Sequence, residues 1–487
     1  MSNTMDTKEK YKRLVRFALS TLDMLIMTVI YAYFWFSYYH QRSVIGGLYF
    51  KWGHYAIICM YAVLIILFAR MFGALRVGYL RVLDVLYSQI LTILFVNAVT
   101  YIQLDLIGRW RFGAHLIPLL WMTGFQMIAA CVWVLLAQHL YKVIYPPRDV
   151  LLIYGVRSPR SIASKIETRS DKYIIKEMVS IVDYDVEEIK AKMLQYPSVL
   201  IGDIPSQYRN KFLKYSFEQN IRCYSVPKIS DIMMRSSETI NLFDTALQLC
   251  RNRGLSAEQQ MIKRFTDIVF SLLMLIPGLP IMALIAICIK AYDGGPILYK
   301  QKRLTLNGEI FDIYKFRSMT QNSEKDGARL CAQGDQRVTP VGHVIRNLHL
   351  DELPQIFNIL KGDMALVGPR PERPEIAADY KKVIPEFDYR LKVKAGLTGY
   401  AQVYGKYNTT PYDKLKLDLY YIENFSIFLD IRILFMTFKI LFQKENTEGV
   451  DINQKTAAER MDKLVEEEKA EELARESSDE RSKEIHD

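Results

Sequence analysis

The stretch IVFSLLMLIPGLPIMALIAICI, residues 268–289, decides the topology of this chain, because it holds 22 residues without a charge. A helix that crosses a bilayer needs about 20 such residues, so length alone predicts a crossing. Pro277 and Pro280 stand at its centre, however, and proline removes a helix donor and clashes with the preceding turn. Each arm then has about ten residues and a length of about 15 Å, which reaches only the middle of a bilayer.

Basic residues flank this stretch on both sides, which favours a segment that returns to the face it entered. They are Lys263 and Arg264 before it, and Lys290, Lys300, Lys302 and Arg303 after it. We therefore predict a re-entrant helix over about residues 265–290, with its break at Pro277 or Pro280. A kinked but complete crossing is the alternative.

Four earlier segments, 17–36, 52–69, 85–104 and 116–138, are also apolar and long enough to cross a bilayer. Basic residues crowd the segment before the first span and the loop between the second and third. The amino terminus is therefore expected in the cytoplasm, and four crossings return the chain to the cytoplasm near Tyr141. Asp23 is the one acid deep in a span, and we interpret it as a residue that faces the helix bundle.

Residues 146–250 alternate short apolar runs with helical stretches, a rhythm typical of a small doubly wound, Rossmann-like α/β domain. The first turn reads YGVRSPRS, with Gly155 as its single glycine. A dinucleotide fingerprint needs several glycines there, so that the backbone can approach a pyrophosphate. A structural or regulatory module is the favoured interpretation, and nucleotide binding is the alternative.

Charge separates the end of the chain from the rest. The chain has a net charge of +10 and a mean hydropathy of +0.03. From Glu445 onward there are 15 acidic and 7 basic residues, which predicts a solvated tail over 446–487. The remaining excess of positive charge favours anionic partners, including phospholipid headgroups. The six cysteines show no metal-ligand spacing and indicate a reducing compartment.

Two adjacent carboxylates, Asp351 and Glu352, open the segment LDELPQIFNILKGDM amid many cations. Such a pair suits a divalent cation with oxygen ligands, or a nucleophile beside a metal ligand. A helix N-cap at Asp351 with a first-turn acid at Glu352 is the plain structural alternative.

Cations and stiff backbone surround this pair in the sequence. Extended KFRSM places Lys315 and Arg317 on one side of the chain. In VGPRPERPE, prolines hold a backbone that pre-organises guanidinium groups for phosphate oxygens. The candidate anion-binding residues are Lys315, Arg317, Arg337, Arg346, Pro369, Arg370, Pro371 and Arg373, and KAGLTGY adds Lys394.

From Lys263 to about Phe442 the chain resembles the bacterial sugar transferases, the monotopic phosphoglycosyl transferases. The strings that carry the resemblance are KRFTDIVFS, GGPILYKQKR, IYKFRSMT, LDELPQIFNILKGDMALVGPRPE, KAGLTGYAQVYG and LDLYYIENFSIFLDI. With four spans and an α/β domain in front, the chain is similar to the large polyprenyl-phosphate sugar-1-phosphate transferases. One departure is His349, where the family usually has serine.

This resemblance implies transfer of a sugar 1-phosphate from a UDP-sugar to undecaprenyl phosphate, with release of UMP, at the start of surface polysaccharide synthesis. Asp351 corresponds to the nucleophile that forms a phosphosugar adduct. Glu352 corresponds to its partner, with Mg²⁺ at the pair. Pro369, Arg370 and Pro371 correspond to the segment associated with the nucleotide diphosphate.

The expected architecture is a four-helix transmembrane bundle (1–145), a Rossmann-like α/β domain (146–250) and a compact cytoplasmic catalytic domain with the re-entrant helix (260–445). The resemblance implies a multi-pass protein of the bacterial inner membrane. A non-catalytic ligand-binding or scaffold protein, and a glycosyltransferase that releases UDP, are the alternatives. Nucleic acid is not expected as a partner, because the cations accompany apolar and Pro/Gly-rich segments. The oligomeric state is open, a homo-oligomer included.

Overall fold

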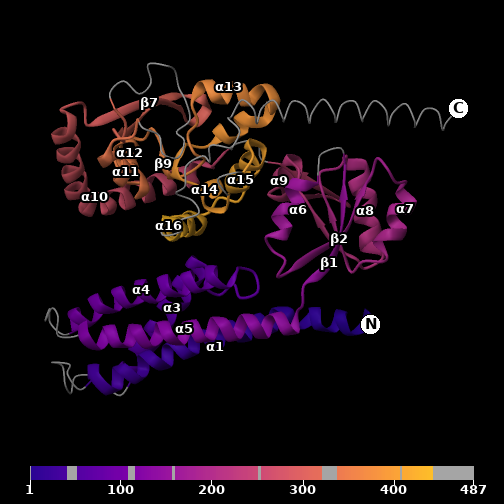
Figure 1. Ribbon diagram of the computed structural model, residues 1–487, viewed down its shortest axis with the longest axis horizontal. Helices are drawn as coiled ribbons and strands as arrows, with labels where there is room; N and C mark the ends of the chain where they lie inside the picture. The colour runs from indigo at the N-terminus through magenta and orange to yellow at the C-terminus, as the bar shows by residue number, and fades with distance from the viewer. Residues whose placement is uncertain are drawn as a thin grey trace. The chain divides into compact units, whose positions relative to one another are not determined.

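The computed structural model describes residues 2–40, 52–107, 116–155, 159–250, 254–320, 337–405 and 409–441. The chain divides into two compact units, Met1–Pro147 and Arg148–Asp487 (Figure 1). The charged tail predicted over 446–487 lies outside the described residues.

The first unit consists of long apolar helices. They are α1 (Ser2–Phe34), which continues as the π-helical η1 (Trp35–Tyr39), then α3 (Gly53–Phe72), α4 (Val82–Ile107) and α5 (Leu116–Ile144). The four apolar segments predicted before residue 140 coincide with these helices, with η1 completing the first and Trp52 as the N-cap of α3. Helix α1 contacts α3 and α5, and α4 contacts the same two helices.

Several polar side chains inside this unit bond to one another across helices. The Gln126 amide donates to the Tyr61 hydroxyl at 2.8 Å and accepts from Asn97 at 2.9 Å. Asp23, buried as predicted, accepts a hydrogen bond from Gln89. Helices in an apolar solvent need such internal partners, because lipid offers none.

The second unit begins with the predicted α/β domain, which the structure confirms. Its parallel sheet has the order β2-β1-β3-β4, so β1 lies between β2 and β3. In Figure 1, α6 lies on one side of the strands, and α7 and α8 lie on the other, as right-handed crossovers require. The strands are β1 (Arg148–Tyr154), β2 (Tyr173–Ser180), β3 (Ser198–Ile201) and β4 (Arg222–Ser225), and the helices are α6 (Arg160–Glu167), α7 (Val186–Met193) and α8 (Ser206–Glu218).

Next come α9 (Ile229–Arg235) and a hairpin of β5 (Glu238–Leu242) and β6 (Thr245–Leu249). Ile229 and Ile232 join the core of the predicted catalytic domain (260–445), called the catalytic part below, so α9 packs on that part. The hairpin is exposed along both strands and was not predicted from the sequence.

Helix α10 (Ala257–Asp293) contains the stretch with the two prolines and extends beyond it at both ends. Ser256 caps its start by accepting a hydrogen bond from Gln259 N. Figure 1 shows its ribbon changing direction on the way to β7, and Pro277 and Pro280 lie at its middle. Its outer face exposes many large apolar side chains, such as Phe265, Ile276 and Leu284.

The catalytic part follows as two small sheets among short helices. Strands β7 (Leu298–Leu304) and β8 (Ile310–Phe316) pair antiparallel, and β9 (Ala365–Val367) pairs parallel with β10 (Gly396–Thr398). The remaining elements are η2 (Leu306–Gly308), α11 (Pro340–Asn347), η3 (Leu350–Glu352), α12 (Gln355–Lys361), α13 (Pro374–Val383), η4 (Pro385–Lys392), α14 (Tyr400–Tyr404), α15 (Pro411–Glu423) and α16 (Ile427–Leu441). One core unites β8, β9, α12, α15 and α16.

Candidate active site

The two adjacent acids lie in the short η3, between α11 and α12. The residue before η3, His349, has a φ of 54°, a left-handed conformation that is uncommon for residues other than glycine. Leu350 and Leu353, which flank the acids, pack against an apolar cluster that includes Met282 of α10 and Phe316 of β8. A strained residue, His349, thus precedes the acids, and a packed leucine lies on each side of them.

Glu352 is engaged by two cations. Its Oε1 accepts from the Lys315 ammonium at 2.7 Å and from the Arg370 guanidinium at 3.0 Å. Burial acts to raise the pKa of Glu352, but the charges of Arg370 and Lys315 outweigh it and hold that pKa well below its usual range. Glu352 is therefore a carboxylate throughout the physiological range.

Asp351 is in a different state. Burial raises the pKa of Asp351 against the opposing charge of Lys315, and the charge of Glu352 adds to the increase. Among the described residues it has no hydrogen-bond or ion-pair partner. Asp351 is not a helix N-cap, because His349 precedes η3 and Pro354 precedes α12 at those positions, although both acids lie in the first turn of η3. Asp351 is thus the available carboxylate, which is what a nucleophile requires.

The segment Pro369–Arg370–Pro371–Glu372 is fixed through its backbone. Four successive carbonyl oxygens each accept a hydrogen bond: Pro369 from Gly396 N at 2.9 Å, Arg370 from Arg390 at 3.0 Å, Pro371 from Arg303 at 3.0 Å and Glu372 from Leu304 N at 3.0 Å. The Arg370 side chain itself is about half exposed and reaches Glu352. The prediction of a stiff segment that presents a guanidinium agrees with this geometry.

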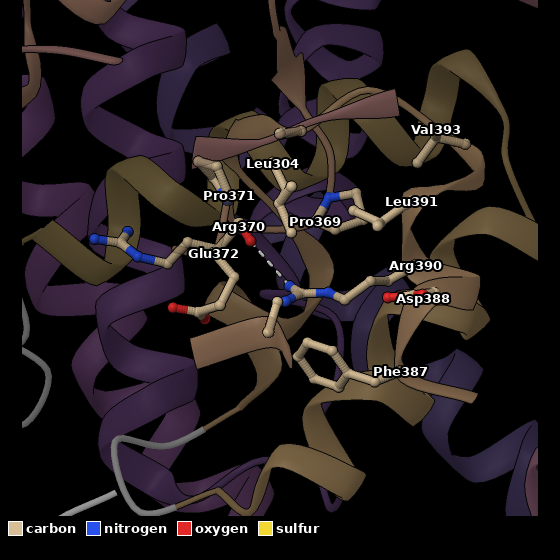
Figure 2. Close-up of a pocket in the computed structure, with 12 residues that line it drawn as sticks. Leu304, Pro369, Arg370, Pro371, Glu372, Phe387, Asp388, Arg390, Leu391 and Val393 are labelled. Atoms are coloured by element: carbon tan, nitrogen blue, oxygen red, sulfur yellow. Dashed lines mark hydrogen bonds between the residues drawn. The ribbon is translucent and has the colours of Figure 1, made fainter. Parts of the chain in front are cut away.

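Figure 2 shows the small hollow behind this segment, lined by apolar side chains such as Leu304, Phe387 and Leu391. Arg390 turns its guanidinium toward the Arg370 carbonyl, whereas the Arg370 guanidinium points away from the hollow. Arg390 is also paired with Asp418 at 2.7 Å, and both are buried. The hollow therefore backs the segment, and the side that carries the Arg370 guanidinium is the side open to an anion.

The other predicted cations lie in different places. Arg317 is paired with Asp293 at the end of α10, and Lys394 donates to Gly362 O at 2.6 Å. Arg346 lies near enough to Asp351 for its charge to lower the pKa of that carboxyl. Arg337 accepts a backbone bond from Thr320, and Arg373 directly precedes α13. Of the predicted set, the structure brings Lys315, Arg346 and Arg370 to the acidic pair.

The sequence of this chain is similar to those of known proteins. Residues 258–444 match the family described as bacterial sugar transferase. A UDP-N-acetylgalactosamine-undecaprenyl-phosphate N-acetylgalactosaminephosphotransferase of Aeromonas hydrophila is 32% identical over 378 residues, which cover 77% of this chain and 82% of that protein. The chain belongs to the bacterial sugar transferase family.

Two further relatives match this sugar transferase over a shorter length. An undecaprenyl-phosphate glucose phosphotransferase of Komagataeibacter xylinus is 41% identical over 203 residues, 38% of that protein. A UDP-glucose:undecaprenyl-phosphate glucose-1-phosphate transferase of Escherichia coli K12 is 35% identical over 209 residues, 43% of that protein. The family resemblance drawn from the motifs is confirmed.

Sequence reasoning missed several residues that position the site of this sugar transferase. Arg390 and Asp418 form the buried pair behind Arg370, and Arg303 binds the next carbonyl. The Asn358 side chain joins α12 to β8 by accepting from Tyr314 N at 3.0 Å and donating to Asp312 O at 2.8 Å. For Asn358 and Asp418 the local signal is a polar side chain within an apolar stretch, IFNIL and KLDLYY, whereas Arg303 and Arg390 stand among other polar residues.

The donor set of the sugar transferase fits a magnesium ion that is shared with a substrate. Within the described ranges no group of three or more His, Cys, Asp or Glu side chains could enclose a metal. Mg²⁺ commonly binds through one or two carboxylates and completes its shell with substrate phosphates and water. Asp351, with no partner among the described residues, and the neighbouring Glu352 supply such a pair.

Proposed function

We propose that this chain transfers a sugar 1-phosphate from a UDP-sugar to undecaprenyl phosphate, releases UMP and so begins the synthesis of a surface polysaccharide. The names of the relatives support the reaction class, since all three pair undecaprenyl phosphate with transfer of a sugar phosphate. The observation that carries the proposal is the contrast within the acidic pair. Glu352 is held by two cations, whereas Asp351 is free to react.

The reaction then has two displacements at one phosphorus atom. A carboxylate oxygen of Asp351 forms a bond to the sugar-bearing phosphorus, and the bond from that phosphorus to the UMP oxygen breaks, so UMP leaves with the electron pair. A phosphate oxygen of undecaprenyl phosphate next attacks the same phosphorus. The acyl phosphate bond breaks, the Asp351 carboxylate is regenerated and a sugar diphospho-lipid is released. Covalent catalysis of this kind allows the two large substrates to react in turn.

Cations on the chain make the first step feasible, because a carboxylate and a diphosphate repel each other. Arg370 extends from a fixed backbone, and a guanidinium fork binds phosphate oxygens in two places. Lys315 and Arg346 add positive charge near Asp351. Asp351 and Glu352 are the residues that would hold Mg²⁺, and the ion would supply further neutralisation of the diphosphate.

Membrane placement follows from the same chemistry, because a lipid phosphate lies at headgroup depth and a nucleotide sugar lies in the cytosol. Within the described residues five helices, α10 among them, are long and apolar enough to cross a bilayer. We propose that α1, α3, α4 and α5 cross the inner membrane, whereas α10 enters and returns. The catalytic part then lies on the cytoplasmic face.

Product analysis tests the proposed reaction. Purified enzyme with Mg²⁺, a panel of UDP-sugars and undecaprenyl phosphate is expected to release UMP, with turnover only when the lipid is present. Asp351→Asn is expected to lose turnover by about 1,000-fold or more and to form no phosphosugar adduct, as for loss of a nucleophile. Lys382→Met, which removes an exposed ion pair on α13, is the control. Release of UDP, or normal turnover by Asp351→Asn, rules the proposal out.

Cysteine labelling tests the re-entrant topology. All six cysteines are first replaced by serine, including Cys59 and Cys288, which are exposed. Met261→Cys and Lys300→Cys then place single thiols before and after the apolar stretch, where both native side chains are exposed. Both thiols are expected to react with an impermeant maleimide from the cytoplasmic side alone. Labelling from opposite sides establishes a complete crossing.

A further inference from the structure

Arg264, in the first third of α10, binds the carboxyl end of α12. Its Nη1 donates to Ile359 O at 2.5 Å and its Nη2 donates to Leu360 O at 2.7 Å. The last carbonyls of a helix have no partner within the helix, and a cation there also complements the helix dipole. In the sequence Arg264 is one of the basic residues beside the apolar stretch. In the structure its guanidinium is bound to protein.

Helix α12 transmits this contact to the acidic pair. It begins at Gln355, three residues after Glu352, and ends at Lys361. The short helix is held between the buried Asn358, which fixes it to β8, and Arg264 at its end. A helix of seven residues thus connects the Arg264 contact to the turn that presents Asp351.

The other end of α10 binds the strand that supplies Lys315. Asp293, the last residue of α10, pairs with Arg317, and its Oδ1 also accepts from Gly295 N at 3.2 Å. Arg317 follows β8 directly and donates its backbone N–H to Ile297 O at 3.0 Å. Lys315, two residues earlier, holds Glu352 at 2.7 Å. Arg317, which is paired with Asp293, is thus two residues along the chain from Lys315, which binds Glu352.

Between these polar contacts the second arm of α10 packs against the same segments. Met282, Ile285 and Ile289 form one buried cluster with Phe316 of β8 and with α11, and Leu350 and Leu353 of the acidic segment pack on it. Strand β8 and the acidic segment therefore pack against α10, and α12 is bound to α10 through Arg264.

We propose that Arg264 and the Asp293–Arg317 pair are positioning residues, which fix the acidic pair and Lys315 relative to each other through the two ends of α10. This inference rests on the proposed function, since it concerns the placement of Asp351 and its partners. It gives α10 a second role beside anchoring. It also assigns Arg317 to the scaffold and not to the substrate.

Substitution of Arg264 tests the first contact. Arg264→Leu removes both hydrogen bonds, and because small displacements of reacting groups are costly, kcat is expected to fall by about 100-fold while KM for the UDP-sugar changes by about twofold. Arg264→Lys keeps a cation at the end of α12 and is expected to recover part of the loss. Arg169→Leu, which removes an ion pair with Asp171 in the α/β domain, is the matched control. If Arg264→Leu fails to fold, the Arg264→Lys variant alone decides: wild-type kcat overturns the proposal.

Paired substitutions test the second contact. Asp293→Asn and Arg317→Gln are expected to lower kcat by a similar factor, and the double variant by no more than either, because one interaction is lost in all three. The reversed pair, Asp293→Arg with Arg317→Asp, is expected to restore part of the activity. An increase in KM with Arg317→Gln and none with Asp293→Asn assigns Arg317 to the substrate and overturns this part.

The wild-type enzyme separates the two levels of inference. If it releases no UMP with undecaprenyl phosphate, the proposed function is wrong. If it does release UMP and the Arg264 and Asp293 variants have wild-type kcat, the function stands and the positioning role is wrong.

Discussion

The polar networks of the two units differ in charge. In the first unit, most contacts between side chains of different helices join amides and hydroxyls, as among Tyr61, Asn97 and Gln126, and Asp23 takes part through Gln89. In the catalytic part, buried ion pairs join elements in addition to neutral contacts such as those of Asn358. Lys263 of α10, for example, lies 2.7 Å from Asp430 and 3.8 Å from Asp267, and all three are buried.

This difference separates two uses of an apolar helix. Helices that pack only on one another need just enough polarity to select their partners, and neutral groups achieve this at small cost. Helix α10 instead has charged residues near its ends, where it meets the catalytic part, and its apolar face between them. Hydropathy alone gives the same description for both kinds of helix. The partners of the polar residues distinguish them.

The largest effect is expected on the stability of the catalytic part, from the loss of a buried cation. Lys263→Met leaves Asp267 and Asp430 buried without their cation, and breaking a buried pair in this way costs about 3–5 kcal/mol. Thermal unfolding in detergent is expected to show a large drop in the stability of the catalytic part. A change no larger than that of Lys382→Met contradicts a structural role for the pair.

Arg390→Met is expected to act on substrate binding. It removes the donor to Arg370 O and leaves Asp418 buried without its partner. The segment that presents the Arg370 guanidinium loses one of its four backbone ties, so KM for the UDP-sugar is expected to rise about tenfold, the usual scale for a weakened charged contact. Steady-state kinetics of UMP release measure this. An unchanged KM shows that the tie is dispensable.

A smaller effect is expected from Lys315→Met, in the pH dependence of kcat. The attacking form of Asp351 is the carboxylate, so activity falls as the pH drops through its pKa, which burial raises. Lys315 opposes that increase, so its removal raises the pKa of Asp351 further and moves the acid limb of the profile to higher pH. For the control variant Lys382→Met, the acid limb of the pH profile of kcat is expected to match that of the wild type. A limb that stays in place or moves to lower pH contradicts this electrostatic role for Lys315.

The smallest effect is expected on the stability of the first unit, from the loss of hydrogen bonds between uncharged groups. Gln126→Leu removes contacts with Tyr61, Asn97 and the Met27 carbonyl, and interhelical hydrogen bonds of this kind contribute about 1 kcal/mol. Unfolding in mixed detergent micelles is expected to show this loss, while kcat stays at the wild-type value. A large fall in kcat breaks the separation between the two networks.

Local patterns in the sequence predict much of the fold. The apolar segments, the four parallel strands and the helices between them follow from hydrophobic period and turn residues. The β5–β6 hairpin was missed, because its strands are exposed on both faces and have no apolar alternation against a core. The length of α10 was underestimated, since its charged ends pair within the protein, as Lys263 and Asp293 do.

The site was predictable only in part, for a related reason. Asp351, Glu352 and Arg370 stand in motifs whose residue types indicate their chemistry. The partner of each charge does not follow from its motif. Lys315 and Arg317 are two residues apart, yet one binds Glu352 and the other binds Asp293. Such choices depend on tertiary packing, which no local period encodes.

The four tethered carbonyls of residues 369–372 have a consequence for the surface that a substrate meets. Their lone pairs are directed at donors of the protein, so the main-chain oxygens are already engaged when a diphosphate approaches Arg370. Electrostatic repulsion from those peptide dipoles is thereby reduced. The surface open to an anion is then the half-exposed Arg370 side chain, above main-chain oxygens that are already paired within the protein.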